Sequence, residues 1–314
     1  MRTLYLRTPV PAGTALRNST RRKIGAGRGY FWYLLPVLSF LFVVTLLPVL
    51  YLVITSFTPL TLTNPSTFGD FSRPLQNYTL LLSDTRLHSS IWTQAQLSIA
   101  TVSLQLLLGL VVALLLNSRV EAHDLLRTVF LIPMVLPPIV VAIIWKVLYS
   151  PDISPAWWLF NQFGWRIPAP ITDAHWALPA IIAADTWEWF PFTMLIILAA
   201  LKTMPEEWIE AAKMDGGTSW QITRYITLPY LSGALLVAGL FRLIDSIKTF
   251  PLIYVLTEGG PGTATEVTNY YVFVQSFNFS YLGYSSAISV VLVLLVVALS
   301  WFIVRAVEGK AERA

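Results

Sequence analysis

The side chains best suited to chemistry in this sequence are ionisable residues placed inside long apolar stretches. Asp185 and Glu188 lie three residues apart in one such stretch, and Arg242 and Asp245 have the same spacing in another. Charged side chains are costly inside a membrane and usually face a bundle interior or a polar pathway. A polar stripe on a third stretch follows Gln94 at intervals of three and four residues, which is one face of a helix. The candidate pathway residues are Gln94, Gln105, Asp185, Glu188, Trp189, Arg242, Asp245, Ser246 and Thr249.

These residue types could hold a hydroxylated solute. Carboxylates, amides and an Arg fork bind hydroxyl groups, and aromatic faces cover C–H surfaces. Two structural interpretations remain open beside this one. Arg242 and Asp245 could neutralise each other at i and i+3, and Glu188 could pair with Arg242 between helices.

The composition indicates an all-α polytopic membrane protein. Of 314 residues, 55% are hydrophobic and only 12% are charged, whereas soluble chains average about 25% charged residues. The absence of cysteine excludes disulfides and thiolate metal or redox sites, and the three histidines lie far apart. Six stretches are long enough to cross a hydrocarbon core of about 30 Å. They cover residues 30–57, 91–116, 129–148, 178–201, 230–256 and 286–304.

Prolines fall inside two of these stretches. Pro133, Pro137 and Pro138 interrupt the third predicted span, and Pro191 lies in the fourth. Proline removes a backbone donor and kinks a helix, so both spans should bend there.

The basic residues predict the orientation. Seven lie in the first 29 residues, which contain no acid, whereas the loops predicted on the opposite side carry Arg73, Arg86 and Arg166. The positive-inside rule then places both termini in the cytoplasm. We expect a basic tail over 1–29, a six-helix transmembrane domain over 30–307 and a short tail over 308–314. Lipid headgroups explain the basic excess without any nucleic acid.

The loop over about 202–229, between the fourth and fifth spans, is more elaborate than a connector needs. Thr203 and Glu206 have capping-box spacing for a first short helix, as do Thr218 and Gln221 for a second. Gly216 and its glycine neighbour can end the first helix with positive φ. Pro229 then predicts a turn into the fifth span.

The first of these helices is acidic. Glu206, Glu207 and Glu210 would be repelled by anionic headgroups, which disfavours a helix lying on the lipid surface. An acidic, alanine-containing helix is better suited to a groove on another protein.

The same loop resembles the EAA loop of binding-protein-dependent ABC importer permeases. Glu210-Ala211-Ala212, then Gly216, Ile226 and Leu228-Pro229 match its pattern without a gap. The stretches 254–266 and 282–287 resemble the carbohydrate branch of that family, as in maltose and glycerol-phosphate permeases. Gly217 and Glu258 are small departures. The first external loop, 58–90, is too short for the extra domain of some maltose permeases.

The resemblance implies a type I permease bundle of six helices in the cell membrane whose loop docks on an ATPase. The coupling residues would be Glu206, Glu207, Glu210, Ala211, Ala212, Asp215 and Gly216. Implied partners are a second permease, two ATP-binding-cassette ATPases and an extracytoplasmic solute-binding protein, with a sugar, polyol or glycerol phosphate as substrate. The chain has no phosphate-loop motif, so ATP-Mg would be held by the ATPase and no cofactor by this chain.

Two rival functions are weighed. An ion-coupled secondary transporter could use Asp185, Glu188 and Asp245 as a relay, but no clear inverted repeat supports it. A membrane-embedded enzyme could use Asp185 and Glu188 to bind a metal, but no histidine or acidic cluster accompanies them.

Overall fold

The computed structural model describes residues 26–117, 123–164 and 168–311. The predicted tails lie partly outside these residues, at 1–25 and 312–314. The chain divides into two units, Met1–Leu50 and Tyr51–Ala314. Within the described residues every named element is a helix, and the one β-type pairing is an isolated bridge between Thr61 and Asn64.

The described chain contains the following helices. They are α1 Ala26–Ser56, η1 Pro65–Thr67, α2 Gln76–Ser83, α3 Thr85–Asn117, α4 His123–Val135, α5 Pro138–Leu148, α6 Pro155–Gln162, η2 Pro170–Thr172, α7 Ala177–Lys202, α8 Glu206–Met214, α9 Ser219–Ile222, the π-helix η3 Thr223–Thr227, α10 Leu228–Ile247, α11 Pro251–Leu256, α12 Thr268–Phe273, the π-helix η4 Val274–Asn278 and α13 Leu282–Ala311.

Among the residues that the structure describes, five single helices are long and apolar enough to cross a membrane. They cover Tyr33–Ser56, Thr85–Asn117, Ala177–Lys202, Ser219–Ile247 and Leu282–Arg305. A sixth crossing is possible only as the pair α4 and α5, which are bent by 98° at a short break. The predicted all-α membrane fold is therefore confirmed, with a third span that is not a continuous helix.

The break between α4 and α5 follows from the proline pair. Pro137 and Pro138 have no N–H to donate, and a residue before proline is disfavoured in the α region. Pro137 accordingly has an extended backbone (φ −59°, ψ 138°) and precedes the first turn of α5. The predicted interruption is confirmed at Pro137 and Pro138, whereas α4 continues through Pro133 and α7 continues through Pro191.

The fifth predicted span was wrong at both ends. Helical structure begins at Ser219 and runs through the π-helix η3 into α10, so Pro229 lies within the first turn of α10 and not in a turn of the chain. The π-helix η3 lies directly before the first turn of α10, where the missing N–H of Pro229 costs little. The helix then stops at Ile247, because Pro251 starts the separate helix α11.

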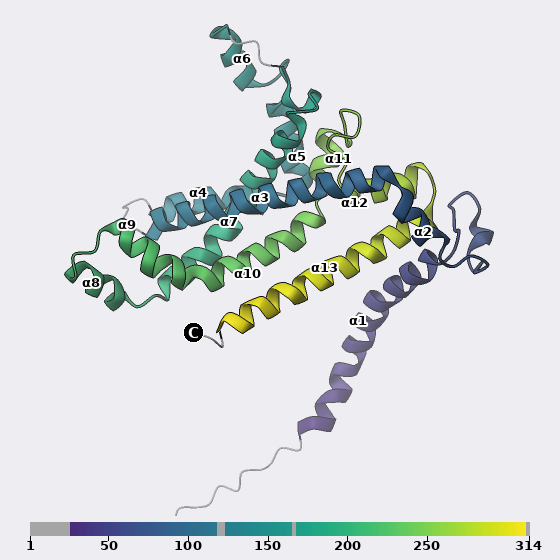
Figure 1. Ribbon diagram of the computed structural model, residues 1–314, viewed down its shortest axis with the longest axis horizontal. Helices are drawn as coiled ribbons and strands as arrows, with labels where there is room; N and C mark the ends of the chain where they lie inside the picture. Colours follow the sequence, from purple (N-terminus) through teal and green to yellow (C-terminus); the bar gives the residue numbers. More distant parts are fainter. Residues whose placement is uncertain (1–25, 118–122, 165–167, 312–314) are drawn as a thin grey trace, which may run out of the picture. The chain divides into compact units, whose positions relative to one another are not determined.

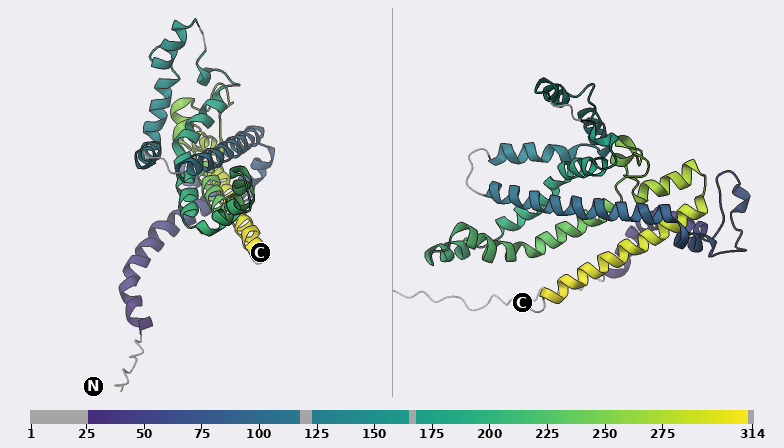
Figure 2. Two further views of the ribbon diagram at one scale, coloured as in Figure 1. Left: turned by 90° about the vertical axis from the view of Figure 1, so that its left-hand side faces the viewer. Right: turned by 45° about the horizontal axis from the view of Figure 1, so that its top comes forward.

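The unit from Tyr51 to the C-terminus is built around α3 and α7, which pack closely, with α10 against both. A Cβ added at Gly109 of α3 would come 2.0 Å from Thr193 Oγ1 of α7, so only glycine permits this approach. Thr193 Oγ1 donates to the Gln105 carbonyl oxygen at 2.6 Å across the same contact. Figure 1 shows α3, α10 and α13 running along the long axis, with α8 and α9 at one end and α2 and α12 at the other, and Figure 2 repeats this arrangement from another side.

Apolar side chains on the outside of the unit fit a lipid environment. Val293, Leu294, Val297 and Phe302 of α13 are all exposed. Water would make such a helix face costly, whereas hydrocarbon does not. The face of α13 away from the bundle is therefore suited to a bilayer.

Candidate transport path and coupling loop

A buried polar network joins α3, α7 and α10 in the centre of the bundle. Arg242 of α10 is 2% exposed, and its Nε donates to Gln105 Oε1 of α3 at 2.8 Å. Gln105 Nε2 in turn donates to Asp185 Oδ2 of α7 at 2.8 Å and to the Asp185 carbonyl oxygen at 3.1 Å. Side chains separated by 80 and 137 positions in the chain thus meet at one point.

Arg242 is neutralised by two carboxylates. Its Nη1 donates to Asp245 Oδ2 at 2.6 Å, and its Nη2 lies 3.6 Å from Asp185 Oδ2. The guanidinium carbon is 4.5 Å from the ring centroid of Trp189, a cation–π distance. The predicted i, i+3 pair with Asp245 is confirmed, while the second partner from α7 is Asp185 and not Glu188.

A second polar contact ties α3 to α10. Gln94 Nε2 donates to Ser98 Oγ and to the Ser246 carbonyl oxygen, both at 3.1 Å. Ser246 Oγ donates to Ser98 Oγ at 2.9 Å. Gln94, Ser98 and Ser246 are all buried. These groups bond to each other, so they fix the packing of the two helices.

The other candidate residues line a small cavity. A space of about 130 Å³ is bordered by Asp185, Glu188, Trp189, Asp245 and Thr249, together with Lys248. Glu188 is 1% exposed, and its Oε1 has no hydrogen-bond partner among the described residues. Buried polar atoms are rarely left in this state without a reason. A hydroxyl donor entering the cavity would satisfy Glu188.

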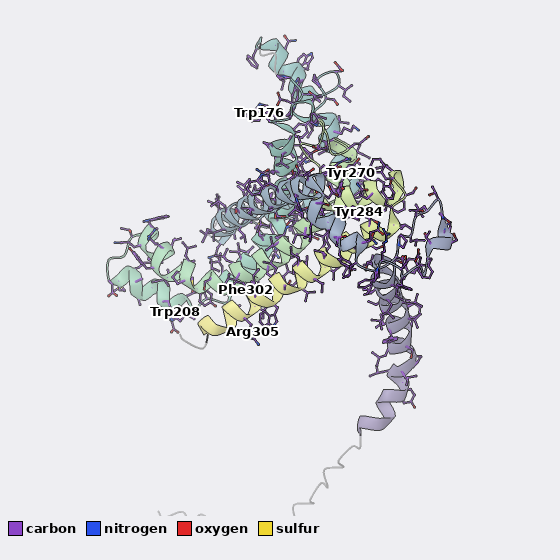
Figure 3. All side chains as sticks on the ribbon, turned by 45° about the vertical axis from the view of Figure 1, so that its right-hand side comes forward. Trp176, Trp208, Tyr270, Tyr284, Phe302 and Arg305 are labelled. Atoms are coloured by element: carbon purple, nitrogen blue, oxygen red, sulfur yellow. The ribbon has the colours of Figure 1, made fainter. Side chains whose placement is uncertain are left out.

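The candidate coupling loop, in contrast to the buried network, is exposed. None of the residues of α8 is buried, so Glu206, Glu207 and Glu210 project from the end of the unit. Trp208 and Met214 are 48% and 89% exposed beside them. Figure 3 shows the labelled Trp208 on this helix, far from Tyr284. Exposed apolar side chains ringed by charge are typical of a protein-docking surface.

The C-terminus of α8 is closed by a Schellman motif. Gly216 has φ +81° and its N–H donates to the Lys213 carbonyl at 3.0 Å, while Gly217 N–H donates to the Ala212 carbonyl at 2.9 Å. Both bonds are those of the αL-glycine helix end. The predicted end of the helix at Gly216, with positive φ, is confirmed. Ala211, Ala212 and Asp215 complete the helix and its end, with Asp215 in the C-cap position.

One of the two predicted capping boxes is present. Thr218 accepts from the Gln221 N–H, and the Gln221 side chain accepts from the Thr218 N–H at 2.8 Å. The first box was wrong: Pro205 occupies the N-cap of α8, and Thr203 caps the preceding helix α7. Thr203 Oγ1 donates to the Ala200 carbonyl at 2.8 Å, because it follows α7 directly and its hydroxyl reaches the last turn.

Sequence reasoning missed a charged cluster at the end of the unit opposite α8. Asp84, between α2 and α3, accepts hydrogen bonds at Oδ2 from the hydroxyls of Tyr271 (2.5 Å) and Tyr284. Arg86 donates from Nε and Nη2 to both carboxylate oxygens of Glu266, each at 2.7 Å. The partners are 180 to 200 residues apart, and no local pattern relates them.

Acidification should weaken this cluster only at low pH. Burial by itself would raise the pKa of Asp84, but hydrogen bonds from the hydroxyls of Tyr271 and Tyr284 and from the N–H groups of Leu87 and Arg86 outweigh it and hold the pKa below its usual 3.8. A carboxyl group whose pKa is lower in the folded state than in the unfolded state stabilises the fold when the pH is above the unfolded-state pKa. This stabilisation is lost as the pH falls through the folded-state pKa. We therefore expect Asp84→Asn to lower the melting temperature at pH 7, and the difference from wild type to shrink only below about pH 4.

Thermal melts of the detergent-solubilised chain from pH 7 to pH 3 measure this difference. Asp70→Asn is the control, since Asp70 accepts only local hydrogen bonds in an exposed loop. A difference that is constant across the whole range would contradict an ionised Asp84 as the acceptor.

Fold and site together define a polytopic membrane protein with a buried polar network at its centre and an exposed loop around α8. Residues 105–312 match the family model described as binding-protein-dependent transport system inner membrane component. The chain belongs to this family and is a permease subunit of an ABC transporter. The ion-coupled alternative is not favoured by this membership.

Several known proteins are similar. A probable ABC transporter permease, y4oQ of Sinorhizobium fredii, is 34% identical over 93% of each chain. The trehalose/maltose transport system permease MalF of Thermococcus litoralis is 36% identical over 76% of this chain and 80% of its own. A bacterial alginate ABC transporter, solved with an alginate pentasaccharide-bound periplasmic protein, has a TM-score of 0.76 over 87% of this chain and 92% of that chain, at 19% identity. That last likeness shows the fold.

Proposed function

We propose that this permease moves a sugar or related polyol across the cell membrane, using energy from a separate ATPase. The observation that carries the proposal is the cavity between α7 and α10, where the unsatisfied carboxyl of Glu188 lies beside the indole of Trp189. A hydrogen-bond acceptor next to an aromatic face suits a solute such as a sugar, whose hydroxyl groups can donate to the acceptor while its C–H groups pack against the ring. Similarity to a trehalose/maltose permease supports the same substrate class.

The network around Arg242 favours a neutral solute over a phosphorylated one. A phosphate site normally offers a free Arg fork or several unpaired donors. Nε and Nη1 of Arg242 are bonded to Gln105 and Asp245, and Nη2, which makes no hydrogen bond, lies 3.6 Å from Asp185 Oδ2, so two carboxylates already neutralise the guanidinium. Glycerol phosphates are therefore the least suitable of the three substrate classes that the sequence left open.

The exposed helix α8 would transmit the energy. We place α8 and both termini on the cytoplasmic side, as the basic N-terminal residues indicate. There α8 would dock on an ATP-binding-cassette ATPase, whose closure on ATP-Mg draws two permeases together. A solute-binding protein would deliver the solute on the opposite side, and α3, α7 and α10 would rock between inward- and outward-facing states.

Gentle-detergent affinity purification of the chain from its native membrane tests this assignment. We expect an ATPase and a second permease to co-purify, and the reconstituted complex to take up a neutral saccharide only with ATP and its binding protein. Glu188→Gln keeps the shape of the side chain and removes its charge. It should lower uptake by about tenfold, the effect of ~1.4 kcal/mol at the transition state, without lowering the amount of complex.

Ser89→Ala is the control, because Ser89 is exposed on α3 and lies outside the network and the cavity beside Glu188. A chain that purifies alone and transports without ATP would refute the importer. Uptake by Glu188→Gln equal to wild type would remove Glu188 from the path and leave the ATP dependence standing.

A further inference from the structure

A second and larger cavity lies at the end of the unit opposite α8. It has a volume of about 470 Å³ and is formed by the loop after α1, by α2, by the α12–η4 segment and by the start of α13. It shares no lining residue with the cavity beside Glu188. Figure 3 places Tyr284, one of its wall residues, at the far end of the unit from Trp208.

The wall of this cavity contains a buried amide without a partner. Gln275 of η4 is 8% exposed and borders the cavity, and its side chain makes no hydrogen bond to any residue that the structure describes. An amide has two donors and an acceptor with two lone pairs. Because the amide borders the cavity, its donors and its acceptor are available to a molecule that enters.

Aromatic surface lies next to this amide. Tyr281 is half exposed at the cavity wall, with its ring 6.4 Å from that of Phe279 and nearly parallel to it. Tyr284 forms another part of the wall. A flat aromatic face beside hydrogen-bonding amides is the combination that holds the C–H face and the hydroxyl groups of a sugar ring.

The charges of the wall exclude an anion. Asp84 is the one charged residue among those bordering the cavity, and none of the lining residues is Lys, Arg or His. The Asp84 carboxylate is already bonded by two tyrosine hydroxyls and by the N–H groups of Arg86 and Leu87. A ligand would therefore bond to Gln275 and the tyrosines, and a negatively charged ligand would be repelled.

We propose that this cavity is a second binding site for a neutral saccharide ring, separate from the path beside Glu188. The saccharide class rests on the proposed function, whereas the site itself rests on the Gln275 amide, the tyrosine walls and the charge of Asp84. A volume of about 470 Å³ is within the usual range of small-molecule pockets. Its position at the end opposite the coupling helix makes it an entry site, occupied before the solute reaches Glu188.

Saturation-transfer NMR on the purified complex in lipid nanodiscs, without ATP or binding protein, tests the site. The probes are trehalose, maltose, glucose and glycerol, with glycerol 3-phosphate as the anion. All samples carry Glu188→Gln, so that the path contributes little. We expect at least one neutral saccharide to give a transfer signal. Gln275→Ala should weaken its affinity by about tenfold or more, because removing the amide leaves the hydroxyl group of the bound saccharide without a hydrogen-bond partner.

Two further variants keep the test decisive. Tyr281→Ala, at a half-exposed position that the fold tolerates, should weaken the same saccharide as Gln275→Ala does. Phe277→Ala on η4 is the matched control, because Phe277 is 64% exposed and does not border the cavity. It should leave binding unchanged.

The proposal is overturned if no neutral saccharide gives a signal, or if the signal survives both Gln275→Ala and Tyr281→Ala. It is also overturned if mass spectrometry finds a lipid that wild type retains and Gln275→Ala loses, since the cavity is then a lipid site. Binding to this cavity is measured without ATP, and uptake is measured with ATP, so the two experiments are independent. A negative binding result refutes the second site alone, and a negative uptake result refutes the proposed function alone.

Discussion

Gly216→Pro should strongly lower coupled uptake, while the chain still inserts in the membrane. The backbone at Gly216 has φ +81°, and proline is restricted to φ near −65°. Proline also removes the N–H that bonds to the Lys213 carbonyl. The end of α8 must then change its course, so Glu210 and its neighbours no longer face the same direction.

We expect ATP-dependent uptake to fall by about tenfold or more. A loss of ~1.4 kcal/mol in the free energy of docking already lowers the binding constant tenfold. Hydrolysis of ATP should continue at its basal rate, and the amount of chain in the membrane should be unchanged. Uptake and hydrolysis measured in the same proteoliposomes separate coupling from assembly.

Gly216→Asn is the matched control. A Cβ at this position meets nothing within 4 Å, so only the positive φ opposes a side chain there. Asparagine tolerates the left-handed region better than other residues with a Cβ. It should retain most uptake. Wild-type uptake in Gly216→Pro would show that the direction of α8 does not matter for coupling.

Arg242→Ala should act first on the stability of the bundle. Removing one partner of a buried ion pair typically costs about 3–5 kcal/mol, because the remaining charge stays buried and uncompensated. Here the guanidinium is buried, and its loss leaves Gln105 Oε1 without its donor and Asp185 without its counter-charge. We expect a much smaller amount of folded chain and a lower melting temperature.

A compensating change distinguishes structure from transport. Arg242→Gln with Asp185→Asn removes the charge from both partners and keeps groups that can bond to Gln105, so it should restore much of the lost stability. Size-exclusion profiles and thermal melts measure the recovery. If Arg242→Ala instead folds normally and loses only transport, the guanidinium contacts the solute and our structural interpretation is wrong.

Local patterns in the sequence were sufficient for the class of protein and for the conformation of the loop around Gly216. Apolar runs of about 20 residues predict membrane-spanning helices, and this prediction does not depend on which other helices they pack against. Gly216 and the box of Thr218 with Gln221 act over a few residues, so their conformations could be predicted directly. The same holds for the break at Pro137 and Pro138, which follows from a missing N–H.

Pairing between helices was decided by the tertiary structure. Asp185 and Glu188 lie on one helix three residues apart, and the sequence does not say which one approaches Arg242. The packing of α3 against α7 at Gly109 brings Gln105 to Asp185, and this leaves Glu188 at the cavity. The Asp84 cluster and the wall around Gln275 likewise join segments about 190 residues apart. Contacts over such separations depend on the whole fold, because residues so far apart in the sequence interact only after the helices have packed together.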